Sequence, residues 1–380
     1  MPSDAVPVPS PSSRPYIGGQ AVLEGVMMRS PSSFAVAVRR ADGSIAIRER
    51  PVEKKAGTSR WAKVPLARGI ATLVESLKLG SEALRFSAEL MEKDMADAER
   101  KVGSVGATLT AFGLALANLV TRADGEPGGG EVVEEKRSAS PMALMTIVAV
   151  LFMVALPQLL AWGAASLLGL HLEVQSARFQ LLTGAFKLIV VLGYLLMIRR
   201  VPEIRRVFQY HGAEHKTIST YEAQEDLVVP NARAKTTLHP RCGTTFLVMT
   251  VLVSIVVWTA IGPLMPHFNG PTWMKQIVFF AIKLPFLPLL AGITFELQRF
   301  TARFCLTGPM RALLWPGFLV QKITTIEPDD DQLEIALAAM RATLWREGVG
   351  TDAAQPKDGA EILAFPSYAA LVEAPGLRAA

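Results

Sequence analysis

Charged residues are scarce in this 380-residue sequence, and cysteine is almost absent. Aspartate, glutamate, lysine and arginine make up 19% of the chain, whereas a typical soluble domain contains roughly 25%. The two cysteines, Cys242 and Cys305, do not suggest the disulfide framework of a small secreted domain. Residues 1–14 lack a basic region followed by an apolar region, so we expect no cleavable signal peptide. Because 50% of the residues are hydrophobic, this composition indicates an integral membrane protein.

Segments that interleave lysine or arginine with aromatic residues are also missing, which argues against the common nucleic-acid-binding modules. The net charge of +5 fits instead a protein that faces the anionic cytoplasmic leaflet of a bilayer. We therefore expect the lipid bilayer to be a partner of this chain, and we expect no nucleic acid.

What the sequence does contain is a set of long apolar segments. A helix that crosses the ~30 Å hydrocarbon core of a bilayer needs about 20 apolar residues. Four segments meet this requirement, at residues 141–165, 179–198, 244–261 and 276–297. Together they predict a membrane domain over residues 141–298 with about four transmembrane helices.

The loops between these segments predict the orientation in the membrane. Residues 199–243, between the second and third spans, contain eight lysine and arginine residues, whereas the two predicted outer loops contain a single lysine. Basic loops stay on the cytoplasmic side of a membrane. This rule places the basic loop and both termini in the cytoplasm.

Soluble segments are predicted before and after the membrane domain in the sequence. Residues 16–101 form a cytoplasmic module, because the β-rich runs 34–40 and 44–50 join at Asp42-Gly43, which is a hairpin signal. A helical pattern follows from residue 60, and this amphipathic helix either lies on lipid headgroups or packs on its own module. The other predicted segments are a disordered tail at 1–15, a weakly apolar helix with a linker at 102–140, an interfacial segment with a helix at 299–349, and a disordered tail at 350–380.

The expected fold is therefore mainly α-helical. It is a polytopic membrane protein with about four transmembrane helices, a small N-terminal module of a β-hairpin and an amphipathic helix, and a C-terminal cytoplasmic helix. The N-terminal module and the C-terminal helix are the surfaces that we expect to bind protein partners.

A cluster of histidine and cysteine in the basic loop predicts a metal site. His211, Glu214 and His215 form the pattern H-x-x-E-H, so both imidazoles project from one face of a helix. This is the order of the inverted zincins, in which two histidines hold zinc and the glutamate is the general base. His239 and Cys242 follow as H-x-x-C at the end of the same loop. The spacing favours a divalent metal ion, with zinc expected, over polar residues that merely face lipid headgroups.

Two kinds of zinc site are compatible with these residues. Three histidines and Cys242 would fill a tetrahedral structural site, whereas a catalytic site keeps one position open for water. A catalytic site would combine His211 and His215 with one further ligand. The candidates for this ligand are His239, Cys242, Glu222, Glu225 and Asp226.

Charged residues inside the predicted spans are a second signal. Lys187 lies in the second span, Lys283 in the fourth, and Glu296 one turn before the cytoplasmic end of the fourth. A lysine at the centre of a span costs at least ~2.5 kcal/mol on insertion scales, which by default suggests a function. The alternative is that each lysine extends towards the outer surface. Glu24 and Arg29 are further candidates, because they are the acid and the base of the apolar run 17–29.

Three motifs in this sequence resemble a bacterial membrane family of the YqhQ type, also called domain of unknown function 1385. The motifs are residues 18–27 (GGQAVLEGVM), 207–216 (VFQYHGAEHK) and 239–244 (HPRCGT). Residues 292–296 and 319–328 are similar to later motifs of the family, and the resemblance covers residues 16–90 and 141–345. The family is described as a predicted metal-dependent enzyme, so the resemblance implies a metal site and a bacterial plasma membrane.

Three functions are compatible with these patterns. The first is a membrane-embedded metal-dependent enzyme, expected to be a hydrolase, in which Glu214 activates a water molecule. The second is a scaffold or assembly factor in which a structural zinc fixes the cytoplasmic loop. The third is a transporter that uses Lys187, Lys283 and Glu296, although no inverted repeat supports it.

Overall fold

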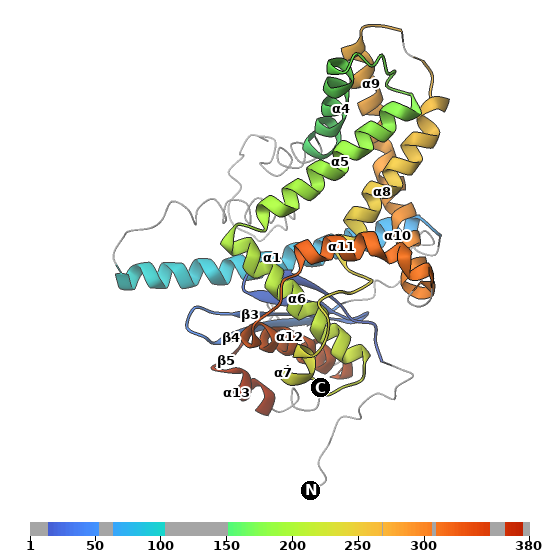
Figure 1. Ribbon diagram of the computed structural model, residues 1–380. Helices are drawn as coiled ribbons and strands as arrows, with labels where there is room; N and C mark the ends of the chain where they lie inside the picture. The colour runs from blue at the N-terminus through green and yellow to red at the C-terminus, as the bar shows by residue number, and fades with distance from the viewer. Residues whose placement is uncertain are drawn as a thin grey trace, which may run out of the picture.

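The computed structural model describes the chain in six segments, residues 14–52, 64–102, 151–267, 269–305, 309–349 and 362–374. Almost all of the tail predicted at 1–15 and of the helix and linker predicted at 102–140 lies outside these segments, as do residues 141–150 of the first predicted span. The described part is mainly helical. Apolar helices rise together on one side of it, and a sheet with its covering helices lies on the other (Figure 1).

Three helical segments in the described part are long and apolar enough to cross a membrane. They are α5 (Ala177–Ile198), α8 (Gly243–Ile261) with the 3-10 turn η4 (Gly262–Leu264), and the run of α9 (Thr272–Lys283), the 3-10 turn η5 (Leu284–Phe286) and α10 (Leu287–Phe304). Pro285 and Pro288 explain the 3-10 turn in the third segment, because proline removes a helical hydrogen-bond donor. Length and composition therefore support three of the four predicted spans.

The first predicted span corresponds to a shorter apolar helix in the described residues. It consists of the π-helical turn η3 (Leu151–Ala155) and α4 (Leu156–Leu167). Buried side chains of α4, α5, α8 and α9 share one cluster, which includes Ala161, Phe179, Trp258 and Phe279. Helix α4 therefore belongs to the same bundle as the three candidate spans.

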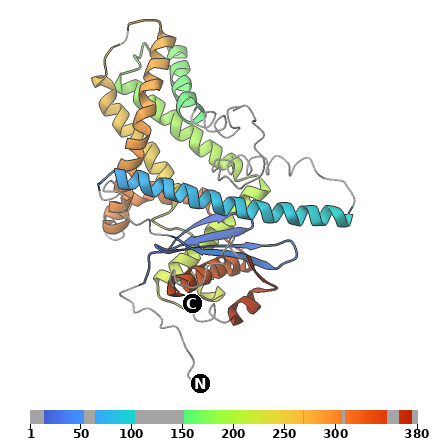
Figure 2. The ribbon, with the colours of Figure 1, turned by 180° about the vertical axis from the view of Figure 1, so that it is seen from behind.

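Helix α1 (Ala67–Val102) runs across the molecule between the apolar helices and the sheet (Figure 2). Near its start, Gly69 lies against α10, where an added Cβ would approach the Cβ of Phe295 to 2.8 Å. Arg68 forms a bidentate ion pair with Glu296 at the same place. The amphipathic helix predicted from residue 60 is thus present and packs on both parts of the molecule.

The predicted hairpin is confirmed and belongs to a larger antiparallel sheet. Its two strands are β3 (Ser33–Arg39) and β4 (Ile45–Pro51), and Gly43 takes a positive φ of 86° in the turn. Two further strands precede the hairpin, β1 (Gly18–Val22) and β2 (Gly25–Arg29). The strand order is β1-β2-β3-β4-β5.

The fifth strand corrects the prediction that residues 350–380 are a disordered tail. Strand β5 (Ile362–Phe365) pairs with β4, and the short helix α13 (Tyr368–Glu373) follows it. A four-residue strand has little sequence signal of its own. It forms here because the open edge of β4 offers backbone hydrogen bonds that only the folded sheet provides.

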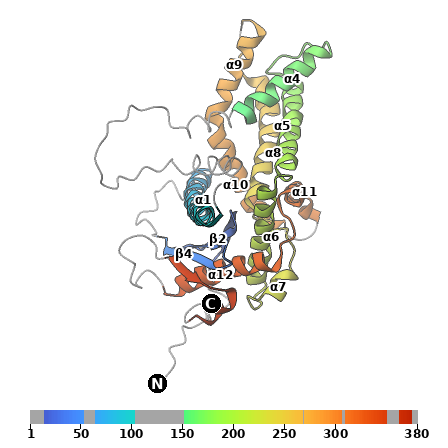
Figure 3. The ribbon, with the colours of Figure 1, turned by 90° about the vertical axis from the view of Figure 1, so that its left-hand side faces the viewer.

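The two faces of the sheet are covered by different helices (Figure 3). Alternate residues of each strand point to opposite faces. On one face, Val26 and Met28 pack with α12 (Asp330–Val349) and α6 (Pro202–Glu222). On the other face, Met27 and Val36 pack with α1. The N-terminal sheet and the C-terminal helix α12 therefore bury apolar faces against each other.

The described segment after α10 packs against α5 and α8. It contains the 3-10 helix η6 (Pro309–Leu314) and α11 (Trp315–Thr324). Val320 of α11 packs with Val191 of α5 and Val248 of α8. Gly317 permits this contact, since a Cβ there would lie 2.4 Å from a methyl carbon of Thr245. This packing brings the end of α11 next to α6 and to the start of α8.

Candidate metal centre

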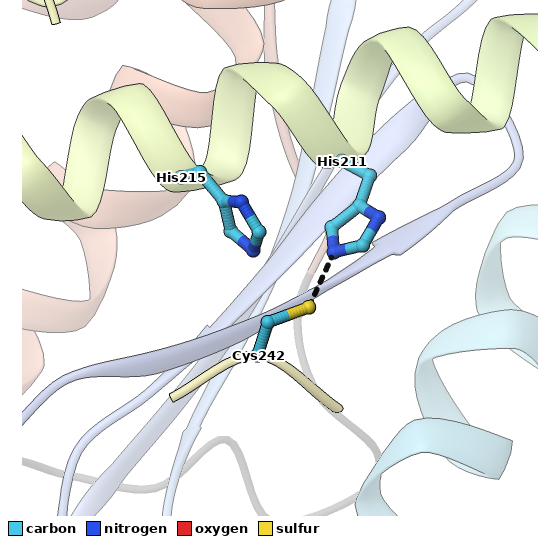
Figure 4. A group of neighbouring side chains, drawn as sticks. All are labelled: His211, His215 and Cys242. Atoms are coloured by element: carbon cyan, nitrogen blue, oxygen red, sulfur yellow. Dashed lines mark hydrogen bonds between the residues drawn. The ribbon is translucent and has the colours of Figure 1, made fainter. Parts of the chain in front are cut away.

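Helix α6 presents the two histidines of the H-x-x-E-H motif. Pro202 occupies its first turn, where the missing N–H costs nothing, and Glu203 complements the helix dipole. His211 and His215 lie one turn apart, and their ring centroids are 4.5 Å apart. Figure 4 shows both rings extending from α6 towards the same thiol. The helical face predicted from the i, i+4 spacing is therefore confirmed.

Cys242 closes this group from the start of α8. It is the N-cap residue of α8, and its Sγ accepts a hydrogen bond from the backbone N–H of Thr244. The distance from Sγ to Nε2 of His211 is 3.1 Å. The ligand atoms of His211, His215 and Cys242 all lie within 4.8 Å of one another. Two nitrogens and one sulfur at this separation are a donor set that a single zinc ion takes.

Backbone carbonyls fix the orientation of both imidazoles. Nδ1 of His211 donates to the carbonyl oxygen of Thr324 at 2.9 Å, and Nδ1 of His215 donates to that of Thr237 at 2.5 Å. A carbonyl can only accept, so the proton sits on Nδ1 and leaves Nε2 for the centre of the group. Histidines that bind metals are typically oriented in this way.

The electrostatics of the pair His211 and Cys242 favour a thiolate. Burial alone would raise the pKa of the Cys242 thiol, but His211 and His215 outweigh it and hold this pKa well below its usual value. For His211, burial lowers the pKa, whereas the charge and hydrogen bond of Cys242 raise it to a net value of about 9. Without a metal ion, His211 and Cys242 thus each favour the charged form of the other. A divalent cation would replace the shared proton.

Glu214 is buried beside these ligands and against the sheet. A Cβ on Gly19 would lie only 2.7 Å from Cγ of Glu214, so a side chain at this position of β1 would force the Glu214 side chain to shift. Burial raises the pKa of Glu214, and the nearby His215 and His211 partly offset that rise. Glu214 is not among the three residues whose ligand atoms converge.

His239 lies next to the group without joining it. Its ring centroid is 5.6 Å from that of His215, but its Nε2 is 3.4 Å from a carboxylate oxygen of Glu222. The side chain of Gln321 holds the backbone of His239 through the N–H and the carbonyl. Burial lowers the pKa of His239, which favours the neutral ring. The structure therefore supports three of the four predicted ligands as one group.

The acidic candidates for the third ligand are engaged elsewhere. Glu222 pairs with Arg241 as well as with His239. Glu225 forms an ion pair with Lys235. Asp226 is exposed. Of the five candidates, Cys242 is thus the one that the fold places against both histidines.

The remaining site candidates lie away from the three ligands. Glu24 pairs with Arg206 of α6, and Arg29 lies 4.0 Å from Glu75 of α1. Both contacts join the sheet to its neighbouring helices. Lys187 and Lys283 contact the polar residues Ser254 and Gln158 in the bundle, whereas Glu296 pairs with Arg68. Among the described residues, Glu296 is thus paired with Arg68 and with neither lysine.

Three supporting groups were not predicted from the sequence, namely the carbonyls of Thr237 and Thr324 and the side chain of Gln321. A backbone carbonyl has no signature in the sequence. Gln321 and Thr324, however, fall within the motif at residues 319–328. Both residues thus contact the candidate site although they lie far from the histidines in the chain.

Comparison with known proteins identifies the family. The family described as "Protein of unknown function (DUF1385)" matches residues 64–346. A Bacillus subtilis (strain 168) relative, "Uncharacterized protein YqhQ", is 30% identical over 349 residues, which cover 90% of this chain and 96% of the relative. No solved structure matches this chain. The chain belongs to the DUF1385 family.

Proposed function

We propose that this protein is a membrane-bound, metal-dependent hydrolase whose metal ion is held by His211, His215 and Cys242. The observation that carries the proposal is the convergence of two carbonyl-oriented imidazoles on one thiol. Zinc is the expected ion, because imidazole nitrogen and thiolate are its usual ligands. Three protein ligands leave a fourth tetrahedral position for water or substrate, as in catalytic zinc sites.

Glu214 is the residue that would move the proton. A zinc ion in this site would supply Lewis-acid activation of water and substrate. The buried carboxylate of Glu214 lies beside the ligands and is placed to accept a proton from the attacking water. Burial raises the pKa of Glu214, so its carboxylate takes up a proton more readily than an exposed glutamate does. The Thr237 and Thr324 carbonyls would keep the two imidazoles in place during this transfer.

A scaffold with a structural zinc is the second candidate function. Its support is His239, which lies close to His215 and would complete a four-ligand shell if its ring turned from Glu222 towards the metal. Such a closed shell holds a loop together but leaves no position for water. The consequence of removing the Glu214 carboxylate distinguishes the two functions.

Reaction of Cys242 with a thiol reagent tests the metal ligand directly. In a Cys305→Ser background, Cys242 is the remaining cysteine. We expect N-ethylmaleimide to label it at least about tenfold more slowly in the zinc-loaded protein than after chelation, because a coordinated thiolate is withheld from reaction. Mass spectrometry measures the rate. Cys305, labelled in a Cys242→Ser variant, is the control and should be insensitive to zinc. Equal labelling of Cys242 with and without zinc would remove it from the site.

The proposed location is a bacterial plasma membrane, with the metal centre and both termini on the cytoplasmic side. Reporter fusions test this topology. We expect fusions at Gly169 and Gly270 to report an outer position and a fusion at Asn231 to report the cytoplasm, since the basic loop should stay inside. An outer signal at Asn231 would contradict the placement of the metal centre.

A further inference from the structure

Two lysines of the apolar bundle, the buried Lys283 and the partly buried Lys187, contact one face of α8. Nζ of Lys187, on α5, donates to Oγ of Ser254 at 3.1 Å. Nζ of Lys283, at the end of α9, lies 5.7 Å from the ring centroid of Trp258. Ser254 and Trp258 are four residues apart on α8 and therefore project from the same side of that helix.

The packing of the bundle fixes both lysines in place. Gly184 lets α5 approach α8, because an added Cβ would lie 2.6 Å from Cγ1 of Ile255. Lys187 lies about one turn after Gly184 on α5, and the close approach of the two helices brings its Nζ within hydrogen-bonding distance of Ser254. Lys283 is 4% exposed, and it also lies 4.9 Å from the ring centroid of Phe279. These lysines are held inside the bundle rather than extended to its surface.

Neutral polar groups surround the lysines. Gln158 of α4 accepts from Lys283 at 3.0 Å and donates to the side chain of Gln276 at 2.7 Å. Nε2 of Gln276 is buried and has no hydrogen-bond partner among the described residues. This amide N–H group is therefore available to donate to a further acceptor beside the lysines.

Neither lysine has a carboxylate partner in the part of the chain that the structure describes. Glu296 is the only acidic residue among the described residues of α4, α5, α8 and the segment Thr272–Phe304. It pairs with Arg68. Lys187 is the eleventh of the 22 residues of α5, so it lies about halfway along a candidate span. Uncompensated cations at this depth are costly, and in proteins they are normally paired.

We propose that Lys187 and Lys283 bind an anionic group, such as a phosphate, within the apolar bundle, with Gln158, Ser254 and Gln276 as its neutral partners. The anion is either free in solution or the headgroup of a lipid that enters between the helices. The site is independent of the metal centre, because Ser254 is 12 residues from Cys242, about 18 Å along α8.

Binding of inorganic phosphate and retention of anionic lipid test this proposal on the full chain. Phosphate is titrated into protein held in phosphatidylcholine nanodiscs, and thermal unfolding reports binding. Native mass spectrometry reports the phosphatidylglycerol retained after purification from mixed nanodiscs. We expect Lys187→Met and Lys283→Met each to weaken one of these interactions roughly tenfold to a hundredfold, the loss expected for one charge-assisted hydrogen bond. Lys187→Arg and Lys283→Arg keep the positive charge, so these variants should retain most of the phosphate or lipid binding of the wild type.

The controls separate this site from general electrostatics and from the metal centre. Lys275→Met removes a lysine from the outer end of α9 and should change neither measurement. Zinc content should be the same in all variants, so failure of the metal proposal would not affect the result. A phosphate effect alone identifies a free anion, and a lipid effect alone identifies a headgroup. Equal binding by the wild type and both methionine variants, or no binding by the wild type, would overturn the proposal.

Discussion

Replacing both His211 and His215 with alanine is expected to abolish metal binding. The variant keeps one of the three proposed ligands, Cys242. Loss of a group that merely orients a ligand typically weakens metal affinity about 10- to 100-fold, so loss of two ligands should exceed roughly a thousandfold. Metal analysis of the purified protein by mass spectrometry measures the effect. The wild type should contain about one zinc ion per chain, and the double variant should contain almost none.

Two histidines outside the basic loop provide a matched control. His171 and His267 lie in the predicted outer loops, away from the metal centre, and their replacement with alanine should leave the zinc content unchanged. The pH dependence is a further check, because binding must displace a proton from His211, whose pKa is about 9 in the metal-free protein. Below about pH 9, the apparent zinc affinity should therefore fall about tenfold per pH unit. Unchanged zinc content in the double variant would assign the two histidines to packing alone.

The substitution Glu214→Gln is expected to stop function while leaving the metal in place. Glutamine keeps the size of the side chain, so the close contact with Gly19 is retained, but it cannot accept the proton. A general base contributes roughly 10²- to 10⁴-fold to the rate of a reaction. We therefore expect the variant to insert normally, to retain its zinc and to fail to complement a strain that lacks the gene.

The control for this experiment is Glu203→Gln, which removes an exposed carboxylate from the first turn of the same helix. It should complement fully. Full complementation by Glu214→Gln as well would contradict the hydrolase and favour the scaffold with a structural zinc. Loss of zinc from Glu214→Gln would instead show that this carboxylate supports the ligands.

The features that the sequence predicts correctly are those set by local periodicity. The hairpin at Asp42-Gly43 follows from two β-rich runs around a residue that tolerates a positive φ. The candidate spans follow from uninterrupted apolar composition, which requires no knowledge of neighbours. The shared face of His211 and His215 follows from the helical repeat alone. In each case the information lies within about 20 consecutive residues.

The composition of the metal centre was decided by tertiary packing. The sequence left His239 and Cys242 as equal candidates, since both lie at the end of the basic loop. The fold distinguishes the two residues. Gln321 of α11 hydrogen-bonds to the backbone of His239, and Glu222 of α6 contacts its ring. Cys242, in contrast, is the N-cap of α8 and faces His211. Choosing between them requires the position of a helix nearly 80 residues further along the chain.

The sheet shows the same limit at a larger scale. Periodicity predicted one hairpin, but β1, β2 and β5 complete a five-stranded sheet, and β5 comes from a tail that was predicted to be disordered. Short strands have weak local preferences, and their backbone hydrogen bonds exist only when a neighbouring edge is present. The sequence by itself therefore determined the apolar helices, the hairpin and the paired histidines. Only the tertiary structure decided which thiol, carbonyls and carboxylate surround them, because those contacts join residues that are distant in the chain.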